Sequence, residues 1–198
     1  MVKTIKLAYV FPGQASQKAG MGRDLYDNFD SARAVFKLAD ETLGFPLSQL
    51  CFEGPEEVLR QTINTQPALL TVSFACLKAI QDINESKGLP PPSFVAGHSL
   101  GEYTALAAAG VLDFADAVYL ARERGRLMYE AGLEKPGGMA ALIGLDEASL
   151  AAICNETGAQ IANINCPEQL VISGEEDKLA KATALAKARG AKRIMPWR

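Results

Sequence analysis

A glycine-flanked serine at residues 97–101 (Gly-His-Ser-Leu-Gly) constrains the fold of this chain more than any other feature. A short apolar run precedes it at 93–96, and a segment rich in helix-forming residues follows it at 102–109. Glycine permits turns and close backbone contacts that other residues resist, so the pattern predicts a strand, a sharp turn and a helix with Ser99 at the exposed tip. The turn places Ser99 at a helix N-terminus, where unpaired amides favour negative charge. Ser99 is therefore a candidate nucleophile.

The only histidine of the chain, His98, directly precedes this serine. Adjacent residues at such a turn point in different directions, whereas a general base must approach the hydroxyl through space. We therefore interpret His98 as a side chain that is packed or hydrogen-bonded beneath the turn. The sequence provides a nucleophile without an obvious base.

Composition narrows the class of protein. The chain has 198 residues, of which 48% are hydrophobic and 22% charged, as expected for a soluble globular protein of one or two domains. A net charge of −3 gives no global sign of nucleic-acid binding. Apolar runs stay well short of the ~20 residues that cross a bilayer, and the start does not resemble a signal peptide, which predicts a cytoplasmic location without membrane contact. The four cysteines are scattered, so we expect buried thiols and no metal site.

The first 130 residues predict an α/β domain with an incomplete sheet. Only residues 6–11 and 93–97 are typical of buried strands, whereas helical patterns lie at 30–44, 65–83 and 113–128, with shorter ones between them. Parallel sheets flanked by helices usually contain about four to six strands. Two strands cannot bury so many helices, so we expect further strands from sequence that is not in this chain.

The remainder predicts a small self-contained domain. The pattern indicates strands and helices in the order βαββαβ, at 139–143, 146–155, 160–164, 169–173, 175–189 and 191–195. This order is the ferredoxin-like unit, an antiparallel sheet with two helices on one face. A break at 134–138 separates it from the preceding helix, so we expect domains at 1–130 and 137–198.

Three arginines lie on the helix that follows Gly110, and their spacing separates them. Arg122 and Arg126 are four residues apart beside Glu123, which suits a solvated surface. Arg124 lies above the apolar stripe and should lean toward the packed side, where an unpaired guanidinium is costly. Its partner is either a carboxylate of the same chain or a substrate carboxylate held by two parallel hydrogen bonds. The residues alone leave both alternatives open.

Several motifs together resemble one family, the malonyl-CoA:acyl carrier protein transacylases and their polyketide acyltransferase relatives. They are Val10-Phe11-Pro12-Gly13-Gln14, Thr65-Gln66-Pro67-Ala68-Leu69, Gly97-His98-Ser99-Leu100-Gly101-Glu102-Tyr103, Arg124-Gly125 and Asn163-Ile164-Asn165. The match covers essentially the whole chain. It implies a large α/β, hydrolase-like subdomain with a parallel sheet, incomplete here, and a complete ferredoxin-like βαββαβ small subdomain.

The resemblance also implies roles for the catalytic residues. Ser99 would attack the malonyl thioester, and the backbone amides of Gln14 and Leu100 would stabilise the oxyanion. Arg124 would hold the free carboxylate of the malonyl group, which favours a substrate over an internal partner. The acyl-enzyme would then react with the phosphopantetheine thiol of an acyl carrier protein, so the chain itself needs no cofactor.

Other residues are candidates for binding rather than catalysis. Gln66, His98 and Asn165 are candidate substrate-binding residues, although an asparagine between two strands is more often a turn residue. The basic residues from Lys178 to Arg198 are either a solvated helix face or a docking surface for an acidic carrier protein.

The family's general base is a histidine that follows the small subdomain, and this sequence stops at Arg198 before reaching it. We therefore expect a C-terminally truncated transacylase whose activity alone is doubtful. Two alternatives stay open. One is an acyl hydrolase on the same scaffold, and the other is an inactive or split carrier-protein-binding fragment that a second chain or missing segment completes.

Overall fold

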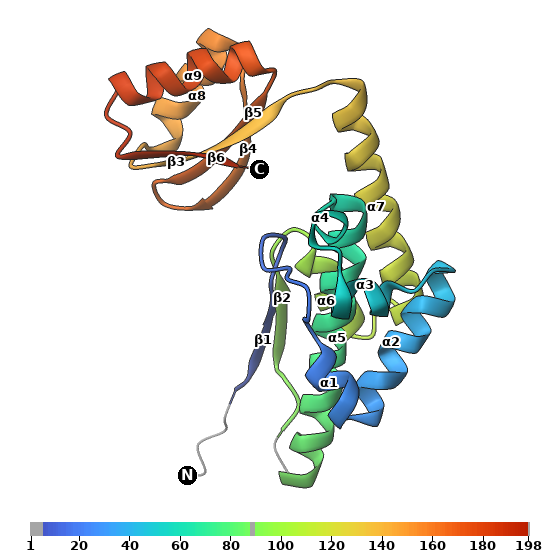
Figure 1. Ribbon diagram of the computed structural model, residues 1–198. Helices are drawn as coiled ribbons and strands as arrows, with labels where there is room; N and C mark the ends of the chain where they lie inside the picture. Colours follow the sequence, from blue (N-terminus) through green and yellow to red (C-terminus); the bar gives the residue numbers. More distant parts are fainter. Residues whose placement is uncertain (1–5, 88–89, 198) are drawn as a thin grey trace, which may run out of the picture. The chain divides into compact units, whose positions relative to one another are not determined.

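The computed structural model describes residues 6–87 and 90–197 of the chain (Figure 1). The chain divides into two compact units, Met1–Glu130 and Ala131–Arg198. Each unit contains its own cluster of buried hydrophobic side chains. Among the described helices, none combines the length and hydrophobicity that a bilayer span requires.

The first unit packs helices against a two-stranded parallel sheet. Strand β1 (Ala8–Phe11) pairs with β2 (Phe94–Gly97), and the register runs from Ala8 opposite Phe94 to Phe11 opposite Gly97. Both predicted strands are therefore present, and β1 is shorter than expected at its start. The helices are α1 (Arg23–Asn28), α2 (Asp30–Leu43), α3 (Leu47–Glu53), α4 (Glu56–Leu59), α5 (Thr62–Lys87), α6 (Gly101–Ala108) and α7 (Phe114–Glu134).

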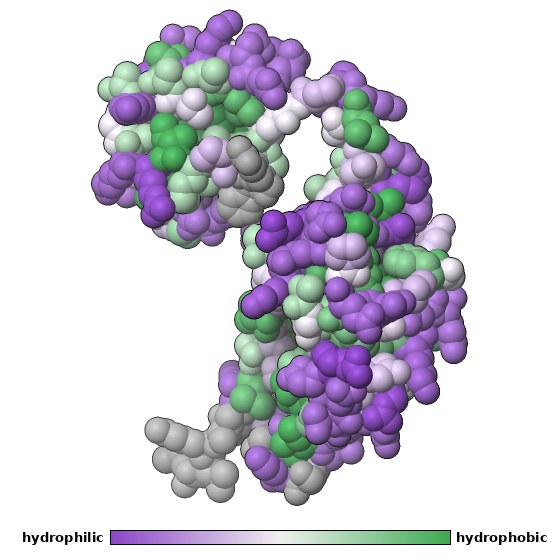
Figure 2. All heavy atoms as spheres, in the orientation of Figure 1, coloured by the Kyte–Doolittle hydropathy of each residue, from purple (hydrophilic) through white to green (hydrophobic). Residues whose placement is uncertain are grey.

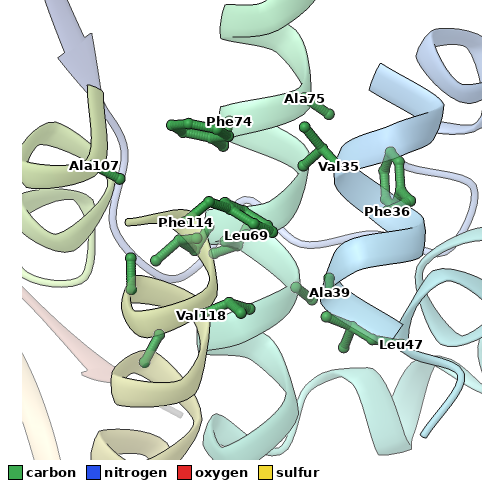
Figure 3. Close-up of a cluster of buried hydrophobic side chains, with 14 of the residues drawn as sticks. Val35, Phe36, Ala39, Leu47, Leu69, Phe74, Ala75, Ala107, Phe114 and Val118 are labelled. Carbon is green, nitrogen blue, oxygen red and sulfur yellow. The ribbon is translucent and has the colours of Figure 1, made fainter. Parts of the chain in front are cut away.

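Helix α5 forms the centre of this unit. Figure 3 shows Val35 and Ala39 of α2 reaching it from one side, and Phe114 and Val118 of α7 approaching from the other. Phe114 stacks on Phe74 of α5 with ring centroids 4.9 Å apart. This packing fixes α5 and α7, the two helices that carry the polar residues near Ser99.

One face of the β1–β2 sheet is apolar and exposed. Residues alternate between the two faces of a strand, so the paired residues Ala8 and Phe94 share one face with Val10 and Ala96. All four are exposed, and the exposed fractions reach 73% for Val10 and 63% for Phe94. Figure 2 shows hydrophobic residues along the edge of the first unit where these strands lie.

The sequence missed two short helices of the first unit, α1 and α3. The sequence patterns predicted no helix at residues 23–28 or 47–53. Helix α1 has six residues and α3 has seven, which is too short for several repeats of the helical hydrophobic period. Helix α5 also begins at Thr62, three residues before the predicted start.

The second unit has the ferredoxin-like topology that the sequence predicted. Its elements are β3 (Gly138–Ile143), α8 (Glu147–Thr157), β4 (Gln160–Cys166), β5 (Gln169–Gly174), α9 (Glu176–Ala188) and β6 (Arg193–Trp197). The strand order is β4-β5-β3-β6, and every neighbouring pair is antiparallel. Leu142 and Ile172 of the central strands pack with Leu150 and Ile153 of α8.

The cysteines occupy different environments. Cys51 and Cys154 are buried, Cys76 is half-buried, and Cys166 is exposed, so the expectation of four buried thiols is confirmed for two of them and is wrong for Cys166. Burial raises the pKa of the Cys51 thiol to about 12, with a smaller contribution from the Asp40 carboxylate. That thiol stays protonated and unreactive near neutral pH.

Candidate active site

Ser99 occupies a tight turn between β2 and α6. Its φ is 54°, in the left-handed region that side chains other than glycine rarely adopt, and the residue is exposed. A Cβ on Gly97 would lie 2.0 Å from the Gly101 carbonyl, and one on Gly101 would lie 2.2 Å from the Phe11 carbonyl oxygen. Only glycine fits at both positions, so the predicted strand, turn and helix are present for the predicted reason.

The loop after β1 lies against this turn. A Cβ on Gly13 would be 2.9 Å from the His98 carbonyl oxygen and 3.7 Å from the Ser99 Cβ. Next to it, the backbone N–H of Gln14 donates no hydrogen bond to any described group. The same holds for the backbone N–H of Leu100 at the start of α6. These two backbone amides are the predicted oxyanion donors, and each N–H lacks a hydrogen-bond partner among the residues that the structure describes.

His98 does not pack beneath the turn as we expected. It is exposed, and its side chain makes no hydrogen bond within the described residues. The Nδ1 atom lies beside Gly13, 3.0 Å from where a Cβ would stand on that residue. The turn carries its own backbone bonds, including the Gly101 amide to the His98 carbonyl at 2.9 Å, and needs no support from the imidazole.

Arg124 on α7 reaches both the serine and a buried glutamine. Its Nη2 donates to Ser99 Oγ at 3.0 Å, and its Nη1 donates to Gln66 Oε1 at 2.5 Å. Gln66 is fully buried, whereas Arg124 is half-buried. Within the described residues, no carboxylate lies within ion-pair distance of Arg124. The internal acidic partner that the sequence allowed is therefore not found there.

Thr62 is a polar residue of this site that sequence reasoning missed. Its hydroxyl donates to Gln14 Oε1 at 2.8 Å and accepts from Gln66 Nε2, also at 2.8 Å. Because we predicted that this helix begins at residue 65, Thr62 lay outside it and was not considered. A helix that begins at 62 puts Thr62 one turn before Gln66, on the same face.

Residues 8–195 match the acyl transferase domain family. This chain belongs to the acyltransferase family. It is 49% identical over 196 residues to the malonyl CoA-acyl carrier protein transacylase of Bacillus subtilis. The matched region covers 96% of this chain and 60% of that relative. The corresponding Escherichia coli K12 protein is 46% identical and is covered over 62% of its length. The chain thus spans about 60% of the curated relatives it matches.

Solved structures agree with this family. An acyl-carrier-protein S-malonyltransferase from Bartonella henselae matches this chain with a TM-score of 0.89 and 44% identity, over 97% of this chain and 62% of that one. A malonyl-transacylase solved in complex with its type II PKS acyl-carrier protein matches with a TM-score of 0.88, over 98% and 62%. These matches support the mixed α/β fold of both units.

The other two arginines of helix α7 have different partners. Arg126 pairs with Glu123 at 2.8 Å and Glu130 at 2.7 Å, as a solvated surface predicts. Arg122 is half-buried, and its Nη1 donates to the Ile63 carbonyl at 2.8 Å. Proline lacks the N–H that would bond this carbonyl from position 67, so Arg122 supplies the missing donor and its prediction as a surface residue is wrong.

Asn165 belongs to the second unit of the chain. It lies inside β4, which continues to Cys166, so the alternative of a turn between strands is wrong. Its pairing with β5 is irregular at this point, and its Oδ1 is buried without a hydrogen-bond partner in the described residues. Asn165 has an unused acceptor, and its substrate-binding role stays a prediction.

Several basic residues near the end of the chain have acidic partners within the second unit, and Arg198 lies outside the described residues. Lys178 pairs with Glu175 at 2.7 Å, and Arg189 pairs with Glu156 at the same distance. Lys192 also approaches Glu168, at 3.2 Å. Such pairs are typical of a solvated surface and leave less free positive charge than the sequence suggests.

Proposed function

We propose that Ser99 is the nucleophile of a malonyl-CoA:acyl carrier protein transacylase and that Arg124 recognises the malonyl carboxylate. The observation that carries the proposal is the position of Arg124, whose guanidinium contacts Ser99 Oγ without an acidic partner among the described residues. A cation beside a nucleophile offers little to a simple acyl chain. It suits an acyl group that ends in a carboxylate, because a guanidinium can hold both oxygens.

In the proposed reaction, Ser99 Oγ attacks the thioester carbonyl of malonyl-CoA. The new C–O bond forms while negative charge collects on the carbonyl oxygen, which the Gln14 and Leu100 amides would stabilise by ~3 to 4 kcal/mol per donor. The C–S bond then breaks and coenzyme A leaves as the thiol. A second thiol, the phosphopantetheine of an acyl carrier protein, takes the malonyl group from Ser99 and regenerates the hydroxyl.

The carrier protein is part of the proposal because a relative at 44% identity has been solved with its acyl-carrier protein bound. The proton of Ser99 needs a separate acceptor. His98 is exposed and not hydrogen-bonded to Ser99, so we assign the proton to a base that is not among the described contacts of Ser99.

A Ser99→Cys variant tests the site without that base. A thiol at a helix N-terminus beside an arginine has a lowered pKa and ionises near neutral pH, so thioester exchange needs no general base. We expect malonyl-CoA to acylate this variant and mass spectrometry of its peptides to place the malonyl group at position 99. The Ser99→Ala variant should stay unlabelled, and labelling elsewhere with position 99 unmodified would refute the assignment.

The fate of the acyl group separates transfer from hydrolysis. With the variant pre-loaded, we expect added pantetheine thiol to remove the malonyl group much faster than water does, and faster than it does from the same thioester in the urea-denatured variant, where the exchange is uncatalysed. Release into water at the same rate with and without pantetheine would instead support the acyl hydrolase.

A further inference from the structure

Thr62 connects the loop after β1 to the arginine beside Ser99. The Thr62 hydroxyl bonds Gln14 Oε1 and Gln66 Nε2, each at 2.8 Å. Gln66 Oε1 accepts from Arg124 Nη1, and Arg124 Nη2 donates to Ser99 Oγ. These hydrogen bonds form one continuous chain from Gln14 to Ser99, and Thr62 is the residue that connects Gln14 to Gln66.

The arginine fixes the direction of every bond in this chain. A guanidinium only donates, so the Gln66 atom that it contacts is the carbonyl oxygen. The Gln66 nitrogen must then face Thr62, whose hydroxyl accepts this bond and keeps its single proton for Gln14. Gln66 is fully buried and cannot exchange these partners for water. Gln66 and Thr62 therefore link Arg124 to Gln14 through directed hydrogen bonds.

The backbone around Thr62 is held tightly by α7, the helix that carries Arg124. A Cβ on Gly125 would lie 2.6 Å from the Thr62 carbonyl oxygen, so glycine allows α7 to approach this closely. Arg122 adds its bond to the neighbouring Ile63 carbonyl and stacks over the Phe45 ring, 4.7 Å from the centroid. The Thr62 hydroxyl thus stands on a fixed support and cannot shift freely.

We propose that Thr62 is a positioning residue that couples recognition of the acyl carboxylate at Arg124 to stabilisation of the oxyanion at the Gln14 loop. The inference rests on the proposed function. A carboxylate that binds Arg124 competes with Ser99 Oγ for the guanidinium donors, while Gln66 and Thr62 hold the other side of the guanidinium. An acyl group without a carboxylate leaves the chain of bonds as it is. Thr62 should therefore contribute more to the reaction with malonyl-CoA than to the reaction with acetyl-CoA.

Three substitutions in the Ser99→Cys background isolate the Thr62 hydroxyl. Thr62→Val keeps the shape and removes the hydroxyl, and Thr62→Ser restores it. Without the hydroxyl, Gln14 Oε1 loses its Thr62 donor and Gln66 Nε2 keeps only Met128 Sδ as a partner among the described residues. Thr71→Val is the matched control, because Thr71 lies on the same helix and its buried hydroxyl has no partner among the described residues. We expect Thr62→Val to slow acylation by malonyl-CoA about 10-fold and to lower the malonyl/acetyl rate ratio, with Thr62→Ser and Thr71→Val close to the parent.

The rate ratio does not depend on the fraction of protein that is folded, so a merely destabilising role of Thr62 would leave it unchanged. Coupling also predicts that Thr62→Val no longer affects the ratio once Arg124→Ala is present. An unchanged ratio in the Thr62→Val variant, or an effect on the ratio that persists without Arg124, would overturn the coupling.

An NMR titration separates this inference from the proposed function. Malonate added to the ¹⁵N-labelled chain should shift the backbone amide signals of both Gln14 and Leu100. In the Thr62→Val variant, the Gln14 response should disappear while the Leu100 response stays. A Gln14 response equal to that of the parent refutes the coupling and leaves the proposed function intact. If neither malonate nor malonyl-CoA shifts the signals of residues around Arg124, both the coupling and the proposed function are refuted.

Discussion

The two sheets of the molecule differ in how far their hydrophobic faces are buried. In the second unit, four antiparallel strands and two helices enclose a core of their own, in which Leu150 and Ile153 are fully buried. In the first unit, the β1–β2 pair leaves Val10 and Phe94 on an exposed apolar face. Parallel sheets are normally buried on both faces. The unit that carries Ser99 therefore has the less complete sheet.

The difference teaches that the turn at Ser99 depends on local contacts rather than on a large sheet. Its geometry comes from backbone approaches at Gly97 and Gly101, within two strands and one helix. The polar residues around it lie on α5 and α7, whose buried side chains belong to one hydrophobic cluster. Changes at these contacts should affect the reaction far more than changes on the exposed face of the sheet.

The largest effect is expected from Gly97→Ala. The added methyl would overlap the Gly101 carbonyl and displace the turn, and misplacing a nucleophile by about 1 Å can cost on the order of 100-fold in rate. The measurement is acylation of the Ser99→Cys variant by malonyl-CoA. Gly132→Ala is the control, because a Cβ there meets nothing within 4 Å, and it should leave the rate unchanged. Equal rates for the two variants would show that the close approach is not required.

A smaller effect separates the exposed sheet face from the helical core. Val118→Thr places a hydroxyl in a fully buried position and should lower the free energy of unfolding by about 1–3 kcal/mol. Val10→Thr makes the same chemical change at a side chain that is 73% exposed and should stay within about 0.5 kcal/mol. Urea denaturation measures both. A cost at Val10 as large as that at Val118 would mean that the face is covered in solution.

The smallest effect concerns the second unit and its dependence on pH. Asp146 caps α8 by accepting from the Ser149 amide at 2.7 Å, and this bond, followed by that of the Ser149 hydroxyl, lowers the pKa of the carboxyl. A lowered pKa in the folded state stabilises the protein above the unfolded pKa of about 4, and this contribution is lost as pH falls through the folded pKa. Asp146→Asn should flatten that part of the acid unfolding curve.

Glu123 in the first unit provides the comparison for this titration. Its pKa is also lowered, chiefly by the hydrogen bond from Arg126, so acid should weaken both units. Hydrogen exchange resolved by residue can follow the units separately. Asp146→Asn should change the acid response of the second unit only, and an equal change in the first unit would contradict this assignment.

The parts of the structure that the sequence predicted are those set by neighbouring residues. The turn at Ser99 needs glycine two positions away on each side, so five consecutive residues are enough to predict it. The ferredoxin-like unit follows from a regular alternation of strands and helices. Short helices such as α1 gave no such repeat and were missed.

The parts that could not be predicted depend on contacts between distant segments. We predicted Arg122 as a surface residue, but it donates to the Ile63 carbonyl, because Pro67 leaves that carbonyl without its helical partner. Thr62 is part of the site because the side chains of Gln14 and Gln66, from two different segments, both hydrogen-bond its hydroxyl. A helical face predicted from spacing does not reveal which backbone groups on another helix need a donor.

The malonyl/acetyl preference of the Ser99→Cys variant, measured with and without Arg124→Ala, tests the central claim most directly. A hydrogen-bonded charge pair contributes about 1.5–3 kcal/mol, so losing the guanidinium should lower the malonyl/acetyl rate ratio by about 10-fold or more. The fall should come from slower malonyl transfer, with the acetyl rate nearly constant. A ratio that stays the same after Arg124→Ala would contradict the account, because Arg124 would then not recognise the acyl carboxylate.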